Sequence, residues 1–292
     1  MYEFRTPQPI SAKLALLAAN IRLDASARDT TTVQLQPSDP DNPRDVELVK
    51  RTEVSFDDDM LSIRSPKSLR SFKPRGSIEV IVQLPTDSSV KAGTATGSLR
   101  ATGALDKCQV DTAAGEITIE RAREAKISKA AGDVTIGEVA EDATIESATG
   151  EIRIERIGGN AKIDNANGDA RIGSIDGDLK LTGANGDVLV QRSGGSVSAA
   201  TAFGTIRLLS VAHGRIKIDS ARGDIEIGIA EGTAAWLNLN TTFGRAHSEL
   251  ESADAPDESQ RTVEVSASTA FGDITVRRAQ PAAGGELAPN EV

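Results

Sequence analysis

The sequence predicts an all-β fold, a single-stranded β-solenoid (β-helix) whose coils repeat about every 18 residues. Three observations carry this prediction. A glycine phrase recurs at nearly constant spacing, apolar and polar residues alternate within each repeat, and aromatic residues make up only 3% of the 292-residue chain. One repeat is too short to bury its own apolar side chains, so stacking on its neighbours must supply the core.

The repeat unit is a six-residue phrase of the form x-Gly-acid-apolar-x-apolar, as in Ala114 to Ile119 and Thr149 to Ile154. Glycine suits a corner between two strands because it reaches positive φ without a Cβ clash. The intervals between successive anchoring glycines are 18, 17, 18, 18, 18, 18, 19, 21 and 28 residues, which predicts ten coils. The anchors stand at positions 97, 115, 132, 150, 168, 186, 204, 223, 244 and 272.

A second strand precedes the glycine in each repeat. Its apolar and polar residues alternate with a period of two, which is typical of strands with one buried face. A single apolar residue between the two strands, such as Val139, Ile157 or Ile175, is expected to fill the corner of the coil. The second strands include residues 125–127, 143–145, 161–163, 179–181 and 216–218.

The irregular part of the chain sets the predicted domain boundaries. Residues 1–95 are expected to form a β-rich N-terminal cap continuous with the solenoid, because an uncovered solenoid end exposes unpaired strand edges. The repeats occupy residues 96–278, with an acidic insertion loop at 246–262, and residues 279–292 are predicted to be a disordered tail. Strand-like runs in the cap are 19–25, 31–36, 52–56, 61–64 and 78–83.

Composition narrows the classes of function. The net charge of −10 opposes binding to a phosphate backbone or to an anionic membrane. One cysteine allows no intramolecular disulfide, and with only two histidines we expect neither a zinc site nor any cofactor. No signal peptide is apparent, and no stretch approaches the ~18 apolar residues of a membrane helix. The sequence therefore predicts a cytoplasmic protein without membrane insertion.

A column of carboxylates follows the repeat glycines and is the best candidate for a metal site in this sequence. Stacked carboxylates can bind Ca²⁺. Alternatively, each accepts hydrogen bonds at its corner or pairs with an arginine two positions on, such as Arg153, Arg171 or Arg207. One acid per coil is sparse for a calcium-binding repeat, which favours the alternative. The column consists of Glu116, Asp133, Glu151, Asp169, Asp187 and Asp224.

Lysines on the predicted outward face of the second strand form the candidate interaction surface. Such a column can meet an acidic polymer, or it can simply keep the sheet face soluble. Trp236 also takes an outward position, since Leu237 and Leu239 take the inward ones, so it either contacts a partner or a sugar or packs under the 246–262 loop. The lysines are Lys126, Lys162, Lys180 and Lys217.

No residue is predicted to be catalytic. Cys108 falls at an inward position of the repeat and is expected to be a small buried hydrophobe. His213 lies in a turn without a serine or cysteine partner in a motif. The tripeptide of residues 222–224, Arg-Gly-Asp, resembles an integrin-binding sequence, but the repeat already accounts for its glycine and aspartate.

The pattern resembles the bacterial putative-adhesin family of β-strand repeat proteins, a domain of unknown function. In that family an N-terminal β segment ending in Leu-Pro precedes repeats of the form Ser/Thr-Gly-Asp-Ile-x-Ile. Here residues 80–85, Val-Ile-Val-Gln-Leu-Pro, supply the phrase, and the repeats begin at residues 96–98, Thr-Gly-Ser. The resemblance covers roughly residues 4–277 and implies a solenoid without assigned catalytic residues.

These observations favour a non-catalytic β-solenoid scaffold or protein-interaction module, with an unknown protein partner and no nucleic acid. One alternative is an adhesin-like surface protein that binds polysaccharide or another protein. Another is a rod that self-assembles through its solenoid ends. An enzyme is disfavoured because tight coils with short loops leave no cleft for chemistry.

Overall fold

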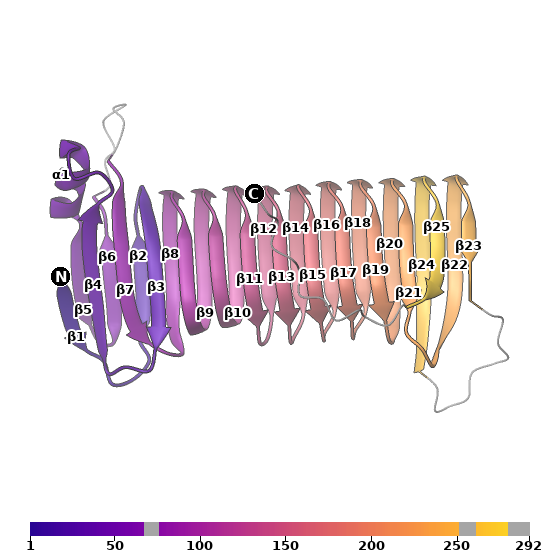
Figure 1. Ribbon diagram of the computed structural model, residues 1–292, viewed down its shortest axis with the longest axis horizontal. Coiled ribbons are helices and arrows are strands. Elements are labelled where there is room, and N and C mark those ends of the chain that lie inside the picture. The colour runs from indigo at the N-terminus through magenta and orange to yellow at the C-terminus, as the bar shows by residue number, and fades with distance from the viewer. Residues whose placement is uncertain (67–75, 251–260, 280–292) are drawn as a thin grey trace.

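The computed structural model describes residues 1–66, 76–250 and 261–279 and confirms the predicted β-solenoid (Figure 1). Its coils contribute strands to two ladders, and every strand pairs in parallel with its counterpart in the next coil. The first ladder carries the glycine phrases, and the second carries the strands that precede the glycines. Both run along the whole length of the rod, so equivalent residues of successive coils form straight columns.

Two long strands, β9 (Leu99–Ala114) and β10 (Ile117–Ala131), pass through both ladders. The remaining strands belong to one ladder each. The first ladder continues through β11 (Val134–Val139), β13 (Ile152–Ile157), β15 (Ala170–Ile175), β17 (Val188–Ser193), β19 (Ile206–Val211) and β21 (Ile225–Ile229). The second continues through β12 (Ala143–Thr149), β14 (Ala161–Asn167), β16 (Leu179–Asn185), β18 (Val197–Phe203) and β20 (Gly214–Arg222).

The register between coils places identical or similar residues over each other in the core. Ile136 pairs with Ile154 and Ile154 with Ile172, and all three are buried. The corner residues expected from the sequence are buried as well, as Val139 and Ile157 show. Each coil thus adds one thin apolar layer, and burial depends on having a neighbour on both sides.

Glycine is required at the corner because the coils approach each other closely there. Gly186 has φ 134°, and a Cβ on it would lie 2.2 Å from the carbonyl oxygen of Gly168 in the preceding coil. A side chain at this position would therefore force adjacent coils apart.

Aspartates beside these glycines hold consecutive coils together. Asp169 Oδ1 accepts a hydrogen bond from the backbone N–H of Asp187 at 2.9 Å, and Asp187 Oδ1 accepts one from Thr205 N at 2.8 Å. The same contact recurs between Asp224 Oδ1 and Asp273 N at 2.8 Å. We call these contacts the aspartate row; they satisfy corner N–H groups that have no strand partner.

The C-terminal coils do not follow the order of the chain, which corrects the sequential coils expected from the glycine spacing. Strand β24 (Arg261–Phe271) pairs on one side with β20 and on the other with β22 (Thr233–Phe243). Likewise β25 (Ile274–Arg278) lies between β21 and β23 (Ala246–Ser248). The last coil of the chain is therefore inserted one layer inside the rod, and the β22–β23 coil forms the end (Figure 1).

Both ends of the segment predicted as an insertion loop, 246–262, are strands, because β23 and β24 extend into it. Its central residues 251–260 lie outside the described part of the chain, as do residues 280–292 of the expected tail.

The N-terminal region contains the same kind of inserted coil. Strand β2 (Ser11–Ala15) lies between β6 (Met60–Arg64) and β8 (Ser88–Thr96), and β3 (Ala19–Ser26) lies between β7 (Ile78–Pro85) and β9. Regular parallel stacking thus begins within residues 1–95. The sequence-predicted strands in this region all form, with ends shifted by a few residues.

Antiparallel strands close the N-terminal end. Strand β4 (Thr30–Pro37) pairs with β7, β1 (Tyr2–Arg5) pairs with β4, and β5 (Glu53–Asp57) pairs with β6. The rings of Phe4 and Phe56 stack with centroids 5.1 Å apart. These strands cover edges of the outermost coil, as expected of a solenoid cap.

The repeat did not predict the helix α1 (Pro43–Arg51), although its start carries ordinary helix signals. Asn42 caps it by accepting a hydrogen bond from Arg44 N at 3.1 Å, and Pro43 occupies the first turn.

One buried position breaks the pattern of an inward polar column on the second ladder. In this column the Thr112 and Thr201 hydroxyls donate to carbonyl oxygens two residues ahead. Lys129 stands in register with Thr112, is only 6% exposed, and its Nζ has no hydrogen-bond partner within the described residues. Burial lowers the pKa of Lys129 below its usual range.

We expect Lys129→Thr to raise the free energy of unfolding by about 1 kcal/mol at neutral pH, because it removes an unpaired buried donor. The folded protein binds fewer protons than the unfolded chain just below pH 10.5, so wild-type stability rises with pH there. The difference in the free energy of unfolding between Lys129→Thr and the wild type should therefore shrink toward pH 10.5. Urea denaturation at several pH values measures it, with the exposed Lys126→Thr as control; a less stable Lys129→Thr would contradict the argument.

The aspartate row predicts a contrast between two substitutions at Asp187. Asp187→Ala removes the acceptor for Thr205 N and should destabilise the protein by about 1 kcal/mol. Asp187→Asn keeps Oδ1 and should cost less than half as much. Thermal denaturation of both variants compares them, and equal losses would show that the hydrogen bond does not matter.

Candidate functional site

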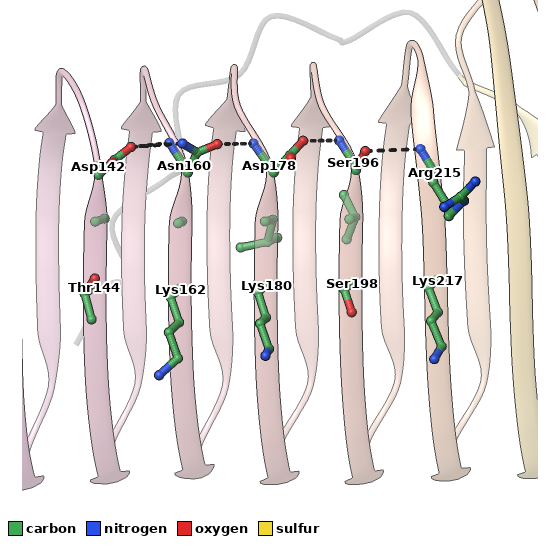
Figure 2. A pocket seen from close by; sticks show the side chains of 14 residues that line it. Asp142, Thr144, Asn160, Lys162, Asp178, Lys180, Ser196, Ser198, Arg215 and Lys217 are labelled. Carbon is green, nitrogen blue, oxygen red and sulfur yellow. Dashed lines mark hydrogen bonds between the residues drawn. The ribbon is translucent and has the colours of Figure 1, made fainter.

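The four predicted lysines lie in one column on the outer face of the second ladder, and all are exposed. Strand register establishes the column directly, since each member pairs with the next. It reads Lys126, Thr144, Lys162, Lys180, Ser198 and Lys217 along the rod. The structure thus brings the lysines together, with a small hydroxyl residue interrupting the column twice (Figure 2).

A second row of hydrogen bonds runs beside the lysines, at the corner where the second ladder begins (Figure 2). Asp142 Oδ1 accepts from Asn160 N at 2.8 Å, and Asn160 Oδ1 accepts from Asp178 N at 3.0 Å. Asp178 Oδ1 then accepts from Ser196 N at 2.8 Å, and Ser196 Oγ from Arg215 N at 3.3 Å. The glycine-based repeat did not predict this row, although an Asp or Asn recurring at one register position is its signal.

The lysines themselves are only weakly engaged. Lys162 Nζ lies 3.0 Å from Asp164 and 3.9 Å from Glu146, and the contact with Asp164 raises the pKa of Lys162. Lys217 Nζ lies 3.8 Å from Asp219. These pairs are exposed, so solvent and salt screen them and they contribute little to stability. Lys126 and Lys180 form no ion pair with any residue in the described ranges, so the column retains cations that can meet a partner.

A shallow depression of about 680 Å³ lies between the corner row and the lysine column. It crosses five coils, from β12 to β20, which at ~4.8 Å per coil is roughly 20 Å along the rod. Its cationic lining comes from Lys162, Lys180, Arg215 and Lys217. The shape suits an extended ligand better than a compact one.

Trp236 lies on the end strand β22, with 63% of its surface exposed. It pairs in register with Glu264, which pairs with Arg215, so it extends the corner row and not the lysine column. Asn238 holds the lysine position on this strand. The structure therefore places Trp236 beside the lysine column, near the C-terminal end of the same face. The alternative of packing under the 246–262 loop depends in part on residues outside the described ranges.

Several carboxylates of the column make the contacts that the alternative to calcium binding predicts. Besides the aspartate row, Arg153 Nη2 lies 3.1 Å from Glu151, and Arg171 pairs with both Glu151 and Asp169. Arg207 instead pairs with Glu226 at 3.6 Å. Across residues 1–66, 76–250 and 261–279, no three His, Cys, Asp or Glu side chains gather in a metal-binding arrangement.

Of the remaining candidates, Cys108 and Arg222 have structural roles. Cys108 is 1% exposed, and burial raises the pKa of its thiol to about 12, so the nucleophilic thiolate is disfavoured. The guanidinium of Arg222 lies between the rings of Phe203 and Phe271, 5.8 and 5.4 Å from their centroids. The arginine of the Arg-Gly-Asp tripeptide is therefore part of a surface stack. His213 is exposed in the turn before β20.

The described residues contain one helix, α1, and it has neither the length nor the apolarity to cross a membrane.

Comparison with known proteins identifies a family and several solved structures that match over most of their length. No curated protein matches the sequence. A putative adhesin from Bacteroides fragilis NCTC 9343 is 14% identical, with 95% of each chain covered and a TM-score of 0.36. A putative adhesin from Parabacteroides merdae ATCC 43184 is 10% identical, with 96% of this chain and 95% of that chain covered and a TM-score of 0.35.

A putative lipid binding protein from Parabacteroides distasonis ATCC 8503 is 10% identical, with 96% of each chain covered and a TM-score of 0.38. Similarity at this level carries no function across. The family comparison matches residues 12–280, nearly the whole solenoid, to a domain of unknown function. The chain belongs to the Toastrack DUF4097 family.

Proposed function

We propose that this chain is a non-catalytic scaffold that holds a protein partner against its lysine-bearing face. The observation that carries the proposal is the straight column of exposed lysines beside a depression that crosses five coils. In the carboxylate column, Asp169 and Asp187 accept hydrogen bonds from backbone N–H groups, and Asp169 also pairs with Arg171.

The chemistry of the face favours an extended acidic segment as the partner. Lys162 and Lys180 stand on adjacent coils, and Lys217 stands two coils further along. Their present ion pairs are exposed and weak, so carboxylates of a partner can replace them at little cost. The net charge of −10 opposes any long polyanion, so the lysine column suits a short acidic segment better than nucleic acid, whose uniform phosphate charge would also meet the acidic remainder of the surface.

A polysaccharide ligand is the second candidate, and Trp236 is the observation that favours it. An exposed indole presents a flat apolar surface with a polar N–H, which suits a sugar ring. This candidate places the protein at the cell surface. The cytoplasmic location stays a prediction from the sequence, and cell fractionation distinguishes the two.

The proposal predicts that binding to an acidic probe depends on the lysine column. Replacing Lys126, Lys162, Lys180 and Lys217 together by Gln should weaken binding of a fluorescent poly-glutamate peptide at least tenfold in an anisotropy titration. Proteins captured from a lysate of the native host should be lost in parallel.

The matched control removes four exposed arginines from the first ladder. The variant in which Arg100, Arg121, Arg156 and Arg192 are replaced by Gln has the same net charge as the lysine variant. It should retain wild-type binding. Equal losses of peptide binding in the two variants would mean that only total charge matters. A protein that binds polysaccharide through Trp236 but does not bind the peptide would favour the second candidate.

A further inference from the structure

The C-terminal end of the rod presents an open strand edge. Among the described strands, β22 pairs only with β24, and β23 only with β25. The outer edge of β22 therefore offers the unpaired backbone N–H and C=O groups of an eleven-residue strand, Thr233–Phe243 (Figure 1). Such an edge is a template for pairing with another strand.

This end strand lacks the features that usually protect an edge. Soluble proteins protect edge strands with charged residues, proline or bulges. Residues 233–243, Thr-Ala-Ala-Trp-Leu-Asn-Leu-Asn-Thr-Thr-Phe, contain no charged residue, no proline and no glycine. They also pair with β24 without a shift in register. The neighbouring strand β24 carries Arg261 and Glu264, although it is paired on both sides.

The end coil also leaves its core layer partly uncovered. Val263, Val265 and Ala267 of β24 are at most 1% exposed. Their counterparts on β22, Ala235, Leu237 and Leu239, are only half-buried. Trp236 and Phe243 on the same strand are each 63% exposed, and Phe243 stacks on Phe271 at 4.8 Å with its other side toward the rod end. A further layer would complete the burial.

The opposite end of the rod cannot supply that layer. Strands β1, β4 and β5 cover the outermost N-terminal coil with antiparallel pairings. Head-to-tail stacking would require this cap to open. The open end can instead meet the same end of a second copy, in the two-fold arrangement that is commonest among protein dimers.

We propose that two copies of this chain associate end to end, by antiparallel pairing of β22 with β22 of the second copy. A two-fold axis perpendicular to the rod makes the facing edges antiparallel. Centring the pair on Asn238, the middle of the strand, places Leu237 opposite Leu239 of the second copy and Trp236 opposite Asn240 of the second copy. No charged residue of β22 faces another in this register, and the second ladder continues across the junction.

The first test places a charge on the axis. Asn238→Lys puts like charges directly opposite each other in the dimer, which destabilises a strand pair. Lysine already occupies this column at Lys217, so the fold should tolerate it. The control, Ser266→Lys, makes the same change in the same column on β24, one coil inside the rod.

Sedimentation velocity should show wild type and Ser266→Lys at twice the 30.6 kDa chain mass, and Asn238→Lys at the single-chain mass. Trp236, the only tryptophan, reports the same change through a shift of its emission on dilution. A monomeric wild type, or species that keep growing with concentration, would overturn the proposal. So would an Asn238→Lys protein that remains a dimer.

The second test is a cross-link that does not depend on charge. Residues facing each other in an antiparallel pair have Cα atoms about 4.5–5.5 Å apart, within the range of a disulfide. Asn238→Cys should therefore form a covalent dimer on oxidation, whereas Ser266→Cys should not. The native Cys108 is buried and does not compete. A cross-link at neither position, or equally at both, would rule out the proposed β22 contact.

Discussion

Close parallel stacking of equivalent residues is the constraint on which the rest of this structure depends. Each coil contributes too little apolar surface to be stable alone, so its Ile, Val and Ala side chains must lie over the same positions of the next coil. The short distance between adjacent coils requires glycine at the corner, where a Cβ would meet the neighbouring carbonyl. It also leaves corner N–H groups without strand partners, and the aspartates accept their hydrogen bonds. Glycine and aspartate are adjacent in the repeat because both serve one corner.

The repeating part of the fold could be predicted from the sequence because the information is local. Alternation within the strands and the 18-residue glycine spacing determine which side chains point inward, and hence that Lys126, Lys162, Lys180 and Lys217 share a face. The order of the end coils could not be predicted. Parallel coils present nearly the same edges, so the spacing of Gly223, Gly244 and Gly272 does not reveal which neighbours pair. That choice depends on long-range contacts that no local pattern encodes.

The residues of the candidate surface could be predicted from the sequence, but their three-dimensional surroundings could not. The register predicted the lysine column, but it showed neither the depression beside it nor the hydrogen bonds that link Asp142, Asn160 and Asp178 along the rod. The environment of Lys129 was equally hidden, because its repeat position looks like that of Thr112. Where aspartates are committed to backbone hydrogen bonds, the cations on the neighbouring column become the chemically available groups. A rod of this kind presents binding positions at regular intervals.

The inserted coils at the two ends have a consequence for how the chain reaches its final form. Residues 233–248 leave the ribosome before residues 261–278, and their strands can pair with the same edge of β20 and β21 that β24 and β25 finally occupy. If the coils were added in the order of their synthesis, the β22–β23 coil would lie inside the rod and the β24–β25 coil would form its end, the reverse of the observed order. Strands β22 and β23 can therefore take their final places only once residues 261–278 have been synthesised and paired with β20 and β21. In the finished rod the coils closest to the two chain termini, β2–β3 and β24–β25, are each covered by a coil from an internal segment of the chain.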